Sequence, residues 1–178
     1  HGWNISDVSL ATGLMYLMTA LLCPIGAPLM LRIGVINVVL IVIFLEILGL
    51  LCTVFAYEKW HLLFSIGLCL GIASGIIGLG LAATVATRWF TARRGLVVGI
   101  MTSAFAAGQL IFMPLMAWIT TVYNWQFAIA PGLTGGIICG VLFLLFGKDW
   151  PSQLKLPAYG DDEIYHPPTN NPDNAVTI

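Results

Sequence analysis

Charged side chains are scarce in this sequence. Only 8% of its 178 residues are Asp, Glu, Lys or Arg, whereas 59% are hydrophobic and the mean hydropathy is +0.95. Since a water-soluble domain carries about 25% charged residues, this chain has too few to cover a surface that faces water. Its net charge of −1 provides no basic surface for nucleic acid, so we expect no nucleic-acid partner.

Motifs for catalysis and metal binding are also missing. There is no HExxH motif, no phosphate-binding loop and no Ser/Lys or Asp/Asp pair within an apolar run, so we predict no enzyme, no cofactor and no metal site. Four cysteines lie in apolar runs without metal or redox spacing, and we interpret them as packing residues: Cys23, Cys52, Cys69 and Cys139. An intramembrane enzyme that uses Glu46 and Gln109 is kept as an alternative.

Long apolar runs are what the chain has instead. A helix needs about 20 apolar residues to cross the hydrocarbon core of a bilayer, and backbone groups in lipid must bond within their own segment. Five runs are long enough: Val8–Leu31, Val35–Ala56, Leu62–Thr87, Gly95–Val122 and Phe127–Gly147. The sequence therefore predicts an all-α polytopic transmembrane bundle over residues 1–147, with consecutive helices antiparallel because the gaps between them are short.

Basic residues favour one side of this bundle. Six of the seven fall in gaps on the same side: Arg32, Arg88, Arg93, Arg94, Lys148 and Lys155. Only Lys59 falls on the other side. Because cytoplasmic loops carry the excess of Lys and Arg, we predict that the N-terminus is outside and the C-terminus inside. Residues 148–178 are polar and Pro-rich, which predicts a mostly disordered cytoplasmic tail or the start of an interdomain loop.

Small residues recur every four positions in three of the runs. We expect these rows to be helix-packing faces, because helices in lipid associate by close packing. The rows are as follows: Gly67, Gly71 and Gly75; Gly99, Ser103 and Ala107; Gly132, Gly136 and Gly140. They fit helices that slide during transport and equally a static interface. Four prolines predict kinks: Pro24, Pro28, Pro114 and Pro131.

Four stretches carry a resemblance to a known family. From Arg88 the chain reads RWFTARRG, continues as a small-residue helix with a Pro-Leu pair, and ends in the turn Asn124-Trp125-Gln126. Residues 27–34 read APLMLRIG, and residues 154–160 read LKLPAYG. Together with GWNISDVSL from Gly2, these stretches resemble the major facilitator superfamily, and most closely its bacterial monocarboxylate/oxalate–formate branch.

The resemblance implies a partial N-terminal half of that fold. The chain would hold family helices two to six and lack helix one and the second six-helix half. It begins at His1 rather than Met, which also suggests a piece of a longer protein. The family carries a glycine where Ala27 stands, an aspartate where Leu31 stands, and a GWR-like turn where Gln126 stands, so three positions depart from its pattern.

The resemblance also gives the basic turns a role. In the family, the turn that contains Arg32 and Gly34 helps to lock the two halves together on the inner face, through an aspartate and nearby arginines. Because Leu31 removes the acid, Arg32 is expected either to take part in such contacts or only to enforce topology. Arg88, Arg93 and Arg94 are expected to contact the missing half, to bind anionic lipid, or to act as orientation signals alone.

Polar residues within the spans are the candidates for solute binding. Thr12 and Tyr16 on the first span, and Ser103 and Gln109 on the fourth, match family helices that line the central cavity. Their side chains would orient a small anion, unless the hydroxyls bond their own helix backbone. Glu46 lies midway along the second span, where a carboxylate costs roughly 2.5–3.5 kcal/mol. It is interpreted as a protonated structural carboxyl, with proton coupling as the alternative.

With the resemblance, the sequence predicts an alternating-access secondary transporter of a small organic solute such as a monocarboxylate. Its surroundings would be membrane lipid in the inner or plasma membrane, and a proton or counter-substrate would drive the transport. Two alternatives stay open. One is a drug or metabolite efflux carrier of the same superfamily, and the other is a non-transporting scaffold subunit held by its glycine rows.

Overall fold

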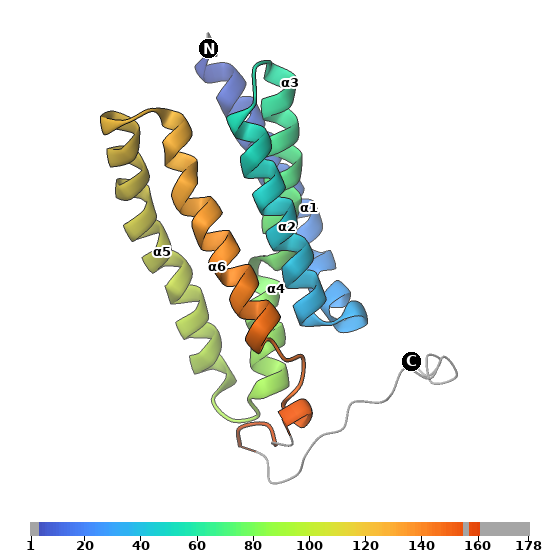
Figure 1. Ribbon diagram of the computed structural model, residues 1–178. Helices are drawn as coiled ribbons and strands as arrows, with labels where there is room; N and C mark the ends of the chain where they lie inside the picture. Colours follow the sequence, from blue (N-terminus) through green and yellow to red (C-terminus); the bar gives the residue numbers. More distant parts are fainter. Residues whose placement is uncertain (1–3, 155–156, 161–178) are drawn as a thin grey trace.

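The computed structural model describes residues 4–154 and 157–160. Nearly all of them lie in helices (Figure 1). The elements follow one another in this order: α1 (Ile5–Ile33), α2 (Val35–Val54), α3 (Lys59–Leu62), the π-helix η1 (Leu63–Leu70), α4 (Gly71–Trp89), α5 (Arg94–Val122), the 3₁₀-helix η2 (Trp125–Ile129), α6 (Ala130–Phe146) and the 3₁₀-helix η3 (Pro151–Leu154). The predicted all-α class is confirmed.

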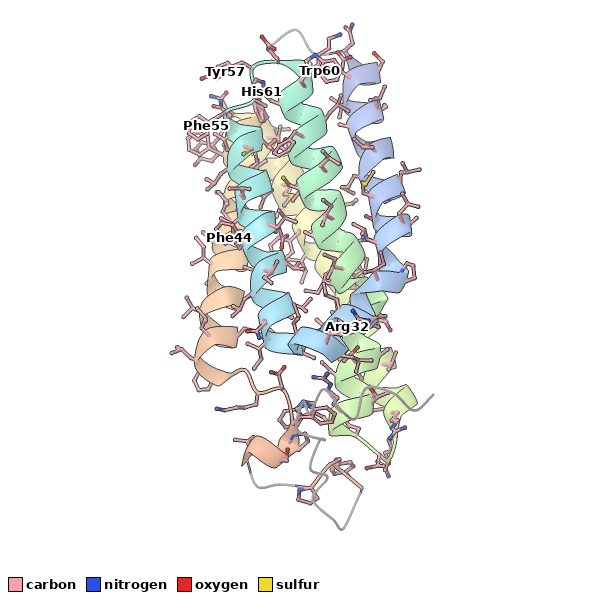
Figure 2. The ribbon with its side chains drawn as sticks, turned by 90° about the vertical axis from the view of Figure 1, so that its right-hand side faces the viewer. Arg32, Phe44, Phe55, Tyr57, Trp60 and His61 are labelled. Carbon is pink, nitrogen blue, oxygen red and sulfur yellow. The ribbon has the colours of Figure 1, made fainter. Side chains whose placement is uncertain are left out.

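Five helical segments of the described chain are long and apolar enough to cross a membrane: Ser6–Ile33, Val35–Val54, Lys59–Trp89, Arg94–Val122 and Trp125–Phe146. The five-span prediction is therefore confirmed. The third span begins at Lys59 instead of Leu62 because α3, η1 and α4 follow one another without a gap. Large apolar side chains cover the outside, including Phe44 at 67% exposure and Trp60 at 76% (Figure 2). Lipid is the solvent that suits such a surface.

The helices form a tight group and a loose one. In Figure 1, α1, α2 and α4 lie together, while α6 rests on α2 and α5 stands to one side. The buried core lies between α1, α2 and α4 and includes Met30, Val39, Val42 and Ala73. No residue of α5 is buried. The chain therefore has a packed core between α1, α2 and α4, whereas the surface of α5 is mostly open.

The first glycine row lies against α1. A Cβ added at Gly67 would lie 2.6 Å from the Leu14 side chain, and one added at Gly71 would lie 3.0 Å from the Met15 carbonyl oxygen. A side chain at these positions would push the two helices apart, so glycine permits backbone contact here. The Thr19 hydroxyl uses this closeness and donates to the Gly71 carbonyl oxygen at 3.3 Å.

The other two glycine rows differ from each other. Gly132, Gly136 and Gly140 of α6 lie along α2, where added Cβ atoms would lie 3.2–3.4 Å from its leucine and isoleucine side chains. A Cβ added at Gly99 of α5 would have no atom of a neighbouring segment within 4 Å. The predicted packing contact of Gly99 is thus not made within the described chain, because α5 leaves that face open.

Two irregularities of the third span have no counterpart in the prediction. Residues 63–70 are π-helical rather than α-helical, and Gly78 inside α4 has non-helical torsions of φ −7° and ψ −132°. The prolines expected to kink the helices lie within helices that continue past them. Pro24 and Pro28 lie inside α1, and Pro114 lies inside α5, and their kinks stay a prediction. Pro131 falls in the first turn of α6, where proline is tolerated.

Candidate functional site at the inner end of the bundle

The polar candidates of the first and fourth spans do not assemble into one site. The Thr12 hydroxyl donates to the Val8 carbonyl at 2.9 Å, and the Ser103 hydroxyl donates to the Ile100 carbonyl at 2.8 Å. Both therefore bond their own helix backbone. Tyr16 and Gln109 are exposed on their helices, and α1 and α5 do not pack extensively against each other. Their solute-binding role remains a prediction.

Glu46 lies on the inward side of α2. Val42, Gly49 and Thr53 share its side of the helix and are buried, whereas Phe44 on the opposite side is exposed. The carboxyl is half-buried, and no hydrogen-bond partner for it is found among the described residues. Because α2 packs against α4 and α6, Glu46 points into the bundle and away from lipid.

The end of the bundle that carries Lys59 is called the outer end after its predicted orientation, and its described residues form one ion pair. The Lys59 ammonium lies 3.1 Å from an Asp7 carboxylate oxygen, with the two side chains 61% and 18% exposed. Asp7 also accepts a hydrogen bond from the Asn4 backbone at 3.2 Å, as part of the capping box that begins α1. This pair joins the start of α1 to α3 and was not anticipated from the sequence.

The opposite, inner end holds a buried arginine. Arg88, near the end of α4, has a side chain only 5% exposed. Its Nη2 donates to the Met30 carbonyl oxygen at 3.0 Å, and its guanidinium lies 4.5 Å from the centre of the Trp150 ring. Its Nη1 lies 3.8 Å from Asp149 Oδ1. Nε and Nη1 have no hydrogen-bond partner among the described residues.

Asp149 connects this arginine to the start of α2. Its Oδ1 accepts a hydrogen bond from the Ile36 backbone N–H at 3.0 Å, so the carboxylate lies at the positive end of the α2 dipole. Gly34 makes room for it. A Cβ at Gly34 would lie 2.8 Å from Asp149 Oδ2, and the φ of +91° favours glycine there. The α1–α2 turn thus fits a carboxylate that comes from beyond α6.

Three further arginines of this end are exposed. Arg32 lies in the last turn of α1, at the opposite end from Trp60 and His61 (Figure 2). Arg93 has left-handed torsions at the start of α5, and the Arg94 Nε donates to the Phe90 carbonyl at 2.6 Å. The structure therefore separates Arg88, which is buried, from Arg93 and Arg94, with which the sequence grouped it.

The chain beyond α6 returns to the bundle a second time. Tyr159 pairs with Phe90 in a single parallel β-bridge, and their rings lie 5.9 Å apart. The Tyr159 N–H donates to the Trp89 carbonyl at 2.9 Å, and its carbonyl accepts from the Thr91 N–H at 2.9 Å. The described part of the predicted tail is thus docked. Lys155, the predicted disorder of 161–178 and the resemblance at Gly2 lie outside the described residues.

Asp149 was missed because sequence reasoning treated everything after the last span as tail. One signal was available, namely an acid directly behind a span on the side where arginines gather. Among the described residues, no group of three or more His, Cys, Asp or Glu side chains could hold a metal ion. What the inner end offers is a network of charges that joins helix ends.

Comparison of the sequence with those of known proteins gives the family of this chain and several relatives. Residues 1–166 match the sequence profile of the Major Facilitator Superfamily. Monocarboxylate transporter 13 of Rattus norvegicus is 32% identical over 106 residues, which are 60% of this chain and 24% of the relative. Monocarboxylate transporter 11 of Homo sapiens is 28% identical over 141 residues, which are 75% of this chain and 29% of the relative. The chain thus spans about a quarter of the length of these relatives.

Proposed function

Because this chain belongs to the major facilitator superfamily, we propose that it is part of a secondary active transporter that moves a small organic anion, of the monocarboxylate class, by alternating access. The observation that carries the proposal is the family match over residues 1–166. The chain is an integral multi-pass membrane protein, and we place it in the inner or plasma membrane. Two relatives named as monocarboxylate transporters support the solute class.

In this proposal the chain supplies part of one half of the carrier, corresponding to family helices two to six. Transporters of this type bind solute near the bilayer midplane, between two halves that rock against each other. The open surface of α5 suits a helix that meets further protein, since no residue of it is buried. Transport of this kind makes and breaks no covalent bond, and a proton or counter-substrate provides the driving force.

Gln109 and Tyr16 are the side chains proposed to meet the solute. Thr12 and Ser103 have their hydroxyls engaged by their own helices, whereas the Gln109 amide and the Tyr16 hydroxyl are exposed and free of such bonds. An amide and a phenol can both donate hydrogen bonds to a carboxylate. Glu46 is proposed to stay protonated inside the bundle, because it is half-buried on the inward side of α2 and no partner for its carboxyl is found among the described residues.

The test is uptake by the full-length natural gene product in proteoliposomes. Radiolabelled lactate, pyruvate and formate are offered under an imposed proton gradient and under solute counterflow, with a panel of drug-like cations as the comparison. We expect saturable uptake of at least one carboxylate. Transport of the cations alone would favour the efflux alternative, and no transport of either group would favour a scaffold.

Variants sharpen the same measurement. Gln109→Leu is expected to raise KM for the carboxylate by about tenfold, the loss of one hydrogen bond to a charged group. The matched control is Thr120→Val on the same helix, where the hydroxyl bonds the Met116 carbonyl at 2.6 Å. An equal effect of both substitutions would contradict a solute contact at Gln109.

Glu46→Gln separates the two interpretations of Glu46, namely a structural carboxyl and a proton-coupling group. Loss of gradient-driven uptake with counterflow retained would indicate proton coupling.

A further inference from the structure

The chain beyond α6 touches the bundle at two described places, residues 149–154 and 157–160, which we call the strap. We propose that the strap is a built-in cytoplasmic tether. In it, Asp149 supplies the carboxylate that the α1–α2 turn lacks at Leu31, and Tyr159 fixes the α4–α5 turn. It would hold the inner ends of α1, α2, α4 and α5 together as one body. Its role in transport rests on the function proposed above.

The first anchor is the Asp149 carboxylate. It lies between the Ile36 N–H at 3.0 Å and the Arg88 Nη1 at 3.8 Å. The same arginine donates to the Met30 carbonyl at the end of α1. A cation at the negative end of α1 and an anion at the positive end of α2 both complement the helix dipoles. One acid and one arginine therefore link α1, α2 and α4 at their inner ends.

The burial of Arg88 makes this acid necessary. A guanidinium that is 5% exposed needs a counter-charge, because an unpaired cation away from water is strongly destabilising. The turn just before α2 provides none, since Leu31 stands beside Arg32 there. Trp150 adds its ring face to the arginine at 4.5 Å, which is within the range of a cation–π contact. Asp149 and Trp150 thus give the Arg88 guanidinium a counter-charge and an aromatic contact.

The second anchor is the backbone of Tyr159. It bonds Trp89 and Thr91 on either side of its bridge partner, and its carbonyl also accepts from the Ala92 N–H at 3.1 Å. The next residue, Gly160, has φ +100°, and a Cβ there would lie 2.6 Å from the Ala92 side chain. Glycine is therefore needed for the strap to lie this close to the α4–α5 turn.

The strap matters because α5 has little else to hold its inner end. Its packing is mainly with α4 and η2, and none of its residues is buried. A half-carrier that rocks as a rigid body needs its helix ends to move together. Weakening the strap should therefore lower the turnover of transport without changing KM, since neither anchor is near Gln109 or Tyr16.

The experiment measures the docking directly. In a background where the four native cysteines are replaced by alanine, Phe90→Cys and Tyr159→Cys are combined and inside-out membrane vesicles are oxidised. Bridged residues lie about 4.8 Å apart, which a disulfide can span, so rapid cross-linking is expected. Adding Asp149→Asn keeps an oxygen that can accept from the Ile36 N–H but removes the charge beside the buried Arg88. It should slow the cross-linking about five- to tenfold, as expected for the loss of an ion pair to a buried arginine.

Controls keep the result interpretable. Asp149→Glu should retain most of the cross-linking rate, and Asp7→Asn, an acid variant at the other end of the bundle, should leave it unchanged. Labelling of a single Tyr159→Cys by an impermeant maleimide should rise by a similar factor when Asp149→Asn is added. No cross-link, or equal rates with and without Asp149→Asn, would overturn the proposal. Cross-linking does not depend on transport, so its failure with carboxylate uptake intact rejects the strap alone, and the reverse result rejects the transport function alone.

Discussion

Each end of the bundle has an ion pair that joins helix ends, but the two pairs differ in burial. At each end an acid accepts a backbone hydrogen bond near the start of a helix and pairs with a basic side chain from another segment. At the outer end the pair is Asp7 with Lys59, whose side chain is 61% exposed. At the inner end it is Asp149 with Arg88, whose side chain is 5% exposed. Exposed pairs contribute little because water and salt screen them, so the inner pair should dominate stability.

The largest expected effect comes from Asp149→Ala. It leaves the Arg88 guanidinium buried without its carboxylate and should destabilise the protein by about 2–4 kcal/mol, somewhat less than a fully buried pair because the distance is long. In purified, detergent-solubilised protein the unfolding temperature should fall by several degrees. Asp149→Glu should recover most of this loss. An unchanged unfolding temperature for Asp149→Ala would remove the contrast between the ends.

A smaller loss is expected from Gly34→Ala. The new Cβ would meet Asp149 Oδ2 at 2.8 Å, and alanine would be strained at φ +91°. Backbone strain of this kind costs about 1–3 kcal/mol. Gly13→Ala is the matched control, since Gly13 has open space around it in α1. If the two substitutions lowered the unfolding temperature equally, the close fit of Asp149 to the turn would be disproved.

At the outer end the expected loss is smaller again. Asp7→Asn breaks the exposed pair and should destabilise the protein by less than about 1 kcal/mol. The difference should shrink further in about 1 M salt, where the Debye length is about 3 Å. The Asp149→Ala effect should persist in the same salt. Equal salt sensitivity of the two variants would show that burial does not distinguish the pairs.

The smallest effect is expected from Arg32→Gln. Arg32 lies at the same end as Arg88 but is exposed, so its replacement should change stability by no more than about 0.5 kcal/mol. Arg88→Gln in parallel should be clearly more destabilising. This pair of variants tests whether burial, rather than the position of the charge on the inner side, decides the contribution.

The transmembrane helices were largely predictable because the apolar character that marks a span extends over about 20 residues, so no single residue decides it. The second span was expected at Val35–Ala56 and is found at Val35–Val54. Local departures such as the π-helix at 63–70 could not be predicted, since they depend on contacts with neighbouring helices. The same limit applied to the inner site. Arg88 was grouped with Arg93 and Arg94 because all three are close in sequence, whereas its burial and its partner Asp149 are products of tertiary structure.

The π-helix has one more consequence, for how glycines stay aligned along the third span. In an α-helix, residues four apart drift around the axis by about 40° per step, so a row of three would turn away from its neighbour. A π-helical turn takes up more residues than an α-helical one, so four residues there fall short of a full rotation and the drift runs the opposite way. The segment Leu63–Leu70 thus acts as a register correction that keeps Gly67 in line with Gly71. Deleting one residue within it would rotate Gly67 by about 100°, out of reach of Leu14.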